Sequence, residues 1–237
     1  MNDPKSRLIV ALDVAGRREA LAAVRRLSGH VGYFKIGLEL FTREGPGLVE
    51  EIRDTGEKIF LDLKLHDIPN TVAGAMRSAC ALGIDMITVH ASGGTAMLEA
   101  ACAQARESAA PPLVLAVTAL TSLSEADMNR FGVQGSMDEW VGRLARTAYE
   151  AGVRGLVASA REIPMLRRTM DPQLRLVIPG IRPAGVAAQD QARTATPYEA
   201  IRAGASFLVV GRPIMQAGDP AAAADAATAE IARALGS

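Results

Sequence analysis

Short runs rich in Val, Ile and Leu recur along the chain, and segments with the apolar spacing of helices lie between them. The runs are nearly continuous rather than alternating, which is typical of parallel strands covered on both faces. Eight such runs are present: Leu8–Leu12, Val31–Ile36, Lys58–Leu63, Met86–Val89, Leu113–Val117, Gly155–Ala158, Leu174–Ile178 and Phe207–Val210. Helical spacing is clear at Leu98, Cys102 and Ala105. Asp219-Pro220 has the pattern of an N-cap and a first-turn proline.

Eight strand–helix units in 237 residues predict an α/β fold of the (β/α)8 TIM barrel type. An open doubly wound sheet is the alternative, but Asp13-Val14-Ala15-Gly16 follows the first strand instead of a glycine-rich dinucleotide turn. No linker-like or low-complexity segment divides the chain. Residues 1–237 are therefore expected to form a single catalytic barrel domain, with its chemistry at the C-terminal ends of the strands.

Composition narrows the possible partners and compartments. The 26 basic and 26 acidic residues balance, so the chain has no global attraction for nucleic acid or an anionic membrane. Both cysteines, Cys80 and Cys102, lie among small apolar residues in helical patterns and are interpreted as reduced packing residues. Neither a signal peptide nor a membrane span is expected, because the N-terminus is polar and the apolar runs are short. A cytoplasmic location and no metal site are expected.

The segment Phe60–Thr71 carries the strongest chemical signal. Asp62 and Lys64 stand two residues apart, so they point to the same face of an extended strand. Charged side chains in a buried strand need a partner, which leaves both a structural ion pair and a reacting centre open. Asp13 and Lys35 end the first two strands, and charges thus close three consecutive strands. This placement favours a functional site over a structural ion pair. His90 follows the fourth strand, and it is either part of this site or a hydrogen-bonded histidine of the core.

Glycine and arginine follow the last two strands. Pro179-Gly180-Ile181-Arg182 comes after the seventh strand, and Gly211-Arg212 comes after the eighth. Barrels often hold phosphate between these loops with backbone N–H groups and a cation, although an arginine can also merely cap the barrel mouth. The long connection Arg182–Thr196 is a candidate lid over a phosphorylated ligand.

Seven segments together resemble the orotidine 5′-phosphate decarboxylase family in its bacterial type, in order and in approximate spacing, over essentially the whole chain. They are Leu8–Asp13, Phe34–Gly37, Phe60–Thr71, Val117–Ser122, Pro179–Pro183, Asp190-Gln191 and Val210–Arg212. The resemblance implies decarboxylation of orotidine 5′-monophosphate (OMP) to uridine 5′-monophosphate (UMP), the last step of de novo UMP synthesis. It also implies a homodimer that works without a metal or organic cofactor.

The resemblance further implies roles for individual residues. Lys64 would protonate C6 of the substrate within a catalytic network of Lys35, Asp62, Lys64 and Asp67, with Asp67 and Thr71 reaching the partner's site. The residues implied in substrate binding are Asp13, Lys35, Asp62, Ile68, Thr71, Thr121, Pro179, Arg182, Gln191, Gly211 and Arg212. Two rival readings are a Mg²⁺-dependent sugar-phosphate decarboxylase or aldolase of the same barrel type, and a non-catalytic nucleotide-phosphate-binding protein.

Overall fold

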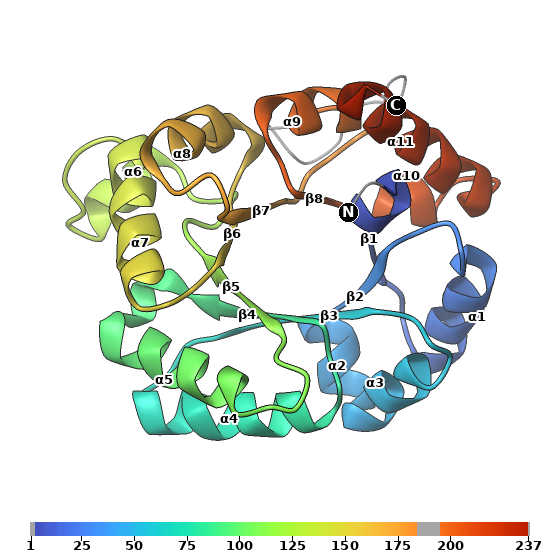
Figure 1. Ribbon diagram of the computed structural model, residues 1–237, viewed down its shortest axis with the longest axis horizontal. Coiled ribbons are helices and arrows are strands. Elements are labelled where there is room, and N and C mark those ends of the chain that lie inside the picture. Colours follow the sequence, from blue (N-terminus) through green and yellow to red (C-terminus); the bar gives the residue numbers. More distant parts are fainter. Residues whose placement is uncertain (1–2, 184–194, 237) are drawn as a thin grey trace.

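The computed structural model describes residues 3–183 and 195–236, and its eight parallel strands close into a barrel in the order β1 to β8 (Figure 1). The strands are β1 Leu8–Ala11, β2 Tyr33–Gly37, β3 Ile59–Leu65, β4 Met86–His90, β5 Leu113–Val117, β6 Gly155–Val157, β7 Arg175–Ile178 and β8 Phe207–Val210. Each strand pairs with its sequence neighbours, and β8 pairs with β1. The (β/α)8 barrel predicted from the sequence is confirmed.

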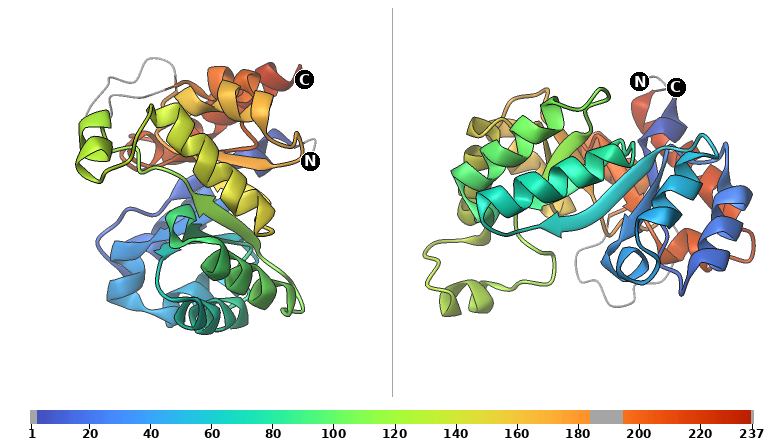
Figure 2. Two further views of the ribbon diagram at one scale, coloured as in Figure 1. Left: turned by 90° about the vertical axis from the view of Figure 1, so that its left-hand side faces the viewer. Right: turned by 90° about the horizontal axis from the view of Figure 1, so that it is seen from below.

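The helices form a ring around the barrel (Figure 1). They are α1 Arg17–Leu27, α2 Leu38–Glu44, α3 Pro46–Arg53, α4 Pro69–Ala81, α5 Thr95–Arg106, α6 Glu125–Arg130, α7 Met137–Glu150, α8 Ile163–Thr169, α9 Pro197–Ala203, α10 Arg212–Met215 and α11 Pro220–Leu235. Figure 2 shows that α6 stands out from the ring on an extended connection. No helix within the described ranges is both long and apolar enough to cross a membrane.

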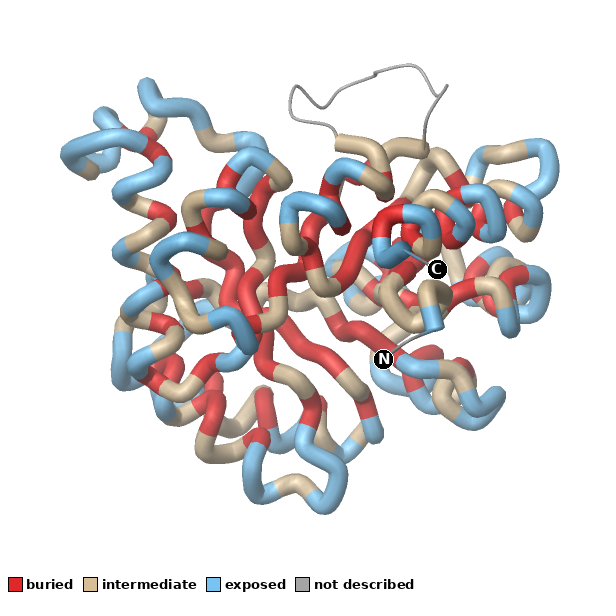
Figure 3. Tube along the Cα trace, turned by 45° about the horizontal axis from the view of Figure 1, so that its top comes forward, coloured by how far each residue is buried: buried red, intermediate tan, exposed pale blue. Residues whose placement is uncertain are grey.

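Two hydrophobic clusters explain why these strands close into a barrel. One cluster joins strand residues such as Leu8 and Val10 to the buried faces of the helices. The other contains strand residues alone: Ile9, Ala11, Phe60, Met86, Leu115, Val177, Phe207 and Val209. Because side chains alternate along a strand, this second set fills the inside of the barrel. Figure 3 shows the buried strands at the centre and exposed segments on the outer helices.

The alternation also determines which side chains reach the barrel mouth. Asp13, Lys35, Asp62 and Thr88 each follow an inward-facing residue by two positions. They are therefore directed toward the barrel axis, Asp13 from just beyond β1 and the other three from within β2, β3 and β4. The fold thus gathers polar groups from four strands at one end.

The observed strand bounds differ from the sequence prediction by two residues or fewer, and the difference reaches two at the start of the second strand and at the end of the third. That strand begins at Tyr33 rather than Val31. Gly32 lies so close to the preceding 3-10 turn, Pro4–Arg7, that an added Cβ would stand 2.7 Å from the carbonyl oxygen of Lys5. This close approach of two backbones requires a glycine there and delays the start of the strand.

Candidate active site

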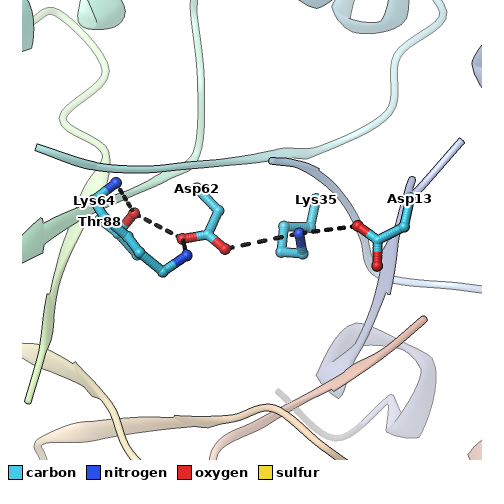
Figure 4. A network of polar contacts seen from close by, with 5 residues as sticks. All are labelled: Asp13, Lys35, Asp62, Lys64 and Thr88. Carbon is cyan, nitrogen blue, oxygen red and sulfur yellow. Dashed lines mark hydrogen bonds and ion pairs between the residues drawn. The ribbon is translucent and has the colours of Figure 1, made fainter. Parts of the chain in front are cut away.

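Four charged side chains of alternating sign line up across the barrel mouth (Figure 4). The Lys35 ammonium nitrogen lies 3.6 Å from an oxygen of Asp13 and 3.7 Å from Oδ2 of Asp62. The other oxygen of Asp62, Oδ1, accepts a hydrogen bond of 2.8 Å from Lys64 Nζ. The chain of contacts therefore runs Asp13–Lys35–Asp62–Lys64. Asp13 lies two residues after the end of β1, Lys35 lies on β2, and Asp62 and Lys64 lie on β3.

The centre of this charge chain is the most buried part. The side chains of Lys35 and Asp62 are 12% and 14% exposed, whereas those of Lys64 and Asp13 are 28% and 58% exposed. Interactions between charges strengthen as water is excluded, so water weakens the electrostatic attraction least at Lys35 and Asp62. Lys64 and Asp13 are the two ends with surface left to meet a ligand.

Lys64 has an unusual backbone conformation. Its φ of 51° lies in the left-handed region, and no other non-glycine residue within the described ranges has a positive φ. Such a conformation costs on the order of 1–3 kcal/mol and is concentrated at functional sites. The spacing of Asp62 and Lys64 predicts an extended strand, but the backbone at Lys64 is not extended. The two side chains do meet, but the register between β3 and β4 shifts between Leu61 and Leu65 instead of continuing.

Thr88 on β4 holds this irregular segment, although it is not among the site residues expected from the sequence. Its hydroxyl oxygen lies 2.8 Å from the Lys64 backbone nitrogen and 2.9 Å from Asp62 Oδ1. Thr88 is fully buried. The only signal for it in the sequence is a hydroxyl inside the otherwise apolar run Met86–Val89.

Gly37 at the end of β2 leaves room for the Lys35 ammonium. A Cβ added there would lie 3.1 Å from Lys35 Nζ. A side chain at this position would press on the central cation of the charge chain. The glycine therefore lets the backbone pass close to the site.

Three cavities meet at Lys35 and Asp62, which line all of them. One cavity of about 170 Å³ extends past Asp13 toward the start of α2. A second, of about 180 Å³, is mostly apolar and is bounded by residues that include Phe60, Val117 and Thr121. Lys64 also lines this second cavity, so its side chain borders a mostly apolar chamber.

The third cavity, of about 270 Å³, contains the residues expected to face phosphate. Its lining includes Pro179, Arg182, Gly211 and Arg212, together with Asp13. Gly211 approaches so closely that an added Cβ would lie 3.1 Å from Asp13 Oδ2. The cavity is therefore shaped by glycine backbone and flanked by two guanidinium groups, a combination suited to an anion.

The segment proposed as a lid begins and ends beside this third cavity. The backbone N–H of Arg182 donates to the carbonyl of Ala195 over 3.0 Å, so the two ends of the segment lie together. Gln191, expected to bind substrate, lies outside the described residues.

Asp67, Ile68 and Thr71 lie outside the charge chain. All three are exposed at the start of α4, and Ile68 is 67% exposed. One carboxylate oxygen of Asp67 accepts a 2.6 Å hydrogen bond from the backbone N–H of Ile68. Within the described part of this chain, Asp67 forms no ion pair with Lys35 or Lys64. A network of all four charges is thus not assembled within one chain.

Two histidines lie next to Lys64. The rings of His66 and His90 are 5.3 Å apart between centroids. Burial is the main cause that lowers the pKa of His90, and the neighbouring His66 and Lys64 lower it further while Asp62 opposes them. His90 is accordingly a neutral neighbour of the charge chain at neutral pH. Across residues 3–183 and 195–236, no group of three or more His, Cys, Asp or Glu is arranged as metal ligands would be.

The fold and the geometry define a (β/α)8-barrel protein with a lysine–carboxylate centre at the mouth of the barrel. Residues 6–227 match the model of the orotidine 5′-phosphate decarboxylase / HUMPS family. The chain belongs to this family.

Individual relatives agree with that assignment. Orotidine 5′-phosphate decarboxylase from Moorella thermoacetica is 51% identical over 233 residues, covering 96% of this chain and 92% of that protein. The enzyme of the same name from Syntrophotalea carbinolica is 50% identical over 238 residues, covering 98% of each. The crystal structure of orotidine 5′-phosphate decarboxylase from Lactobacillus acidophilus superposes with a TM-score of 0.85 at 37% identity, covering 94% of this chain and 98% of the other.

Proposed function

We propose that this protein decarboxylates OMP to UMP, the last step of de novo UMP synthesis, by protonating the substrate carbon from Lys64. The observation that carries the proposal is the Lys64 ammonium, held by Asp62 at the edge of an apolar cavity. The relatives named orotidine 5′-phosphate decarboxylase, about half identical over nearly the whole chain, support this substrate over a sugar phosphate.

The chemistry requires a cation at the reacting carbon. Loss of CO2 from C6 leaves an electron pair in an sp² orbital that is orthogonal to the ring π system, so the ring provides no conventional electron sink. A preorganised ammonium stabilises that developing charge and then supplies the proton to C6. Lys35 and Lys64 both line the apolar cavity, and Lys64 is the more exposed of the two, at 28% against 12%.

Alternating charges keep this ammonium in place. An isolated cation in a partly buried site loses hydration, and a neighbouring carboxylate offsets that loss. Asp62 provides the carboxylate for Lys64, and Lys35 in turn lies between Asp62 and Asp13. The two central groups, Lys35 and Asp62, therefore each have an opposite charge on both sides, which a single ion pair would not provide.

The cavities suggest how the substrate lies. The apolar cavity beside Thr121 receives the pyrimidine, and Asp13 binds the ribose hydroxyls. Pro179, Gly211 and the two arginines Arg182 and Arg212 border the phosphate. The family resemblance also implies a substrate contact for Gln191, which lies outside the described residues. Grip on the distant phosphate supplies binding energy that organises the reacting end.

A second subunit completes the site in this proposal. Asp67, Ile68 and Thr71 project from the surface beside the barrel mouth, and Asp67 has no lysine partner within the described part of its own chain. We infer that these residues contact the substrate bound by the partner in a homodimer. We also infer a cytoplasmic location, because the substrate is a multiply charged nucleotide that does not cross a membrane unaided.

The proposal is tested by mixing the purified protein with OMP and following the fall in ultraviolet absorbance as UMP forms. We expect turnover that is unchanged by EDTA, because the reaction uses a lysine rather than a metal-stabilised enediolate. A chain that turns over a sugar phosphate instead, and loses activity with EDTA, would support the Mg²⁺-dependent rival. Absence of turnover on either substrate would support the non-catalytic binding protein.

A further inference from the structure

We propose that Thr88 is a positioning residue that sets the orientation of both Asp62 and Lys64 for the proton transfer. The inference rests on the proposed function, since it concerns how the same site is held in order. Thr88 itself touches the two reacting-centre residues and not the substrate cavities, whose linings do not include it.

The hydrogen-bond directions at Thr88 follow from simple donor and acceptor rules. The Lys64 backbone N–H can only donate, so the Thr88 hydroxyl oxygen accepts that bond of 2.8 Å. The hydroxyl proton is then free to point at Asp62 Oδ1, 2.9 Å away, which accepts it (Figure 4). One buried hydroxyl therefore connects the backbone of the lysine to the carboxylate that holds its ammonium.

The strand register explains why a side chain is needed at this place. Leu61 pairs with Ile87, and Leu65 pairs with Val89. Three residues of β3, Asp62 to Lys64, thus lie opposite the single residue Thr88 of β4. A bulge of this kind interrupts the ladder and re-aims a side chain. The Thr88 hydroxyl accepts the Lys64 N–H within this interruption and so holds the left-handed turn at φ 51°.

The same hydroxyl determines how the Asp62 carboxylate is rotated. Oδ1 accepts from Thr88 and from Lys64 Nζ, which leaves Oδ2 directed at Lys35, 3.7 Å away. If the Thr88 donor is removed, the carboxylate can turn about its last bond and share its oxygens differently between the two lysines. A misplacement of about 1 Å at a reacting group can cost about 100-fold in rate.

The packing of Thr88 distinguishes this role from ordinary core filling. Thr88 is fully buried in a run of apolar residues, where a valine would fill the same volume without a polar group to satisfy. The methyl group of Thr88 serves the packing, and the hydroxyl serves the bulge and the carboxylate. Removing only the hydroxyl should therefore change the chemistry more than substrate binding.

The decisive experiment compares Thr88→Val with Thr88→Ser, both assayed for OMP decarboxylation. For Thr88→Val we expect kcat to fall about 10- to 100-fold, while KM and the Kd for UMP each change less than about threefold. For Thr88→Ser, which keeps the hydroxyl, we expect kcat within about threefold of the wild type. Thr228→Val is the matched control: Thr228 is also buried, on α11, its hydroxyl has no partner within the described residues, and kcat should not change.

Each outcome decides the proposal. A folded Thr88→Val variant with kcat within about threefold of the wild type would overturn it, as would a serine variant as slow as the valine variant. If Thr88→Val does not fold, Thr88→Ala, which cannot overpack the site, replaces it in the same comparison with Thr88→Ser. Wild-type turnover is measured first, because its absence contradicts the proposed function, and with it this inference, before any variant is made.

Discussion

Asp62 shows how much one residue does at this site. It contacts Lys35, Lys64 and Thr88, and these three partners come from three adjacent strands. A carboxylate with 14% of its side chain exposed is stable only when its oxygens are fully engaged, and here each oxygen faces at least one donor or cation. The sequence shows the charge, whereas only its neighbours explain why it can be buried.

The residue scale also yields a prediction about His90. Its pKa is lowered in the folded protein, mainly by burial, so the unfolded chain binds a proton at higher pH than the folded chain does. Stability should therefore fall as the pH drops below the ordinary histidine value of 6.5. We expect the Tm of the wild type to decline between about pH 7 and about pH 5 more steeply than the Tm of His90→Gln, measured by circular dichroism. Parallel declines would contradict this.

At the element scale, two features hold the ends of the barrel in order. The bulge between β3 and β4 aims Lys64, while α11 packs against α1, α9, α10 and the turn Pro4–Arg7. Asp219 begins α11: its side chain accepts hydrogen bonds from the backbone N–H groups of Ala221 and Ala222 at 3.1 and 3.3 Å. The Asp219-Pro220 start predicted from the sequence is confirmed.

This N-cap gives a prediction about stability alone. Asp219→Ala leaves two helix N–H groups without an acceptor and should lower the free energy of unfolding by about 1 kcal/mol, measured by urea denaturation. Asp219→Asn keeps an acceptor at the same place and serves as the matched control, with little loss. The kcat of both variants should equal that of the wild type, since Asp219 lies outside the cavities at the barrel mouth. A change in kcat without a change in stability would contradict the assignment.

At the scale of the whole molecule, the proposed dimer makes a prediction that a monomeric enzyme would not. Lys64→Ala should lower turnover by at least about 10⁴-fold, because it removes both the charge stabilisation and the proton donor. Asp67→Ala should also be strongly impaired. If Asp67 serves the partner's site, a hybrid of the two variants has one site that carries both changes and one native site. Refolding an equal mixture should then restore about a quarter of the wild-type activity.

The control for the hybrid is each variant refolded alone, which should stay inactive. If Asp67 acts within its own chain, every site in the mixture carries one change, and no activity returns. Size-exclusion chromatography of the same samples checks that a dimer forms.

The expectation that residues 1–237 form one domain stays a prediction, and a single cooperative unfolding transition would support it.

The sequence by itself determined the barrel and the positions of most polar site residues. Apolar runs of strand length are a local property, and the end of each run locates Asp13, Lys35 and Asp62 at one rim once the strands are parallel. The tertiary structure alone decided the rest. The bulge opposite Thr88 depends on the register between β3 and β4, and Asp67 turns toward its own loop rather than toward the lysines. The Thr88 contacts join residues 24 and 26 positions apart in the chain, and the pattern of side chains within one strand does not specify them.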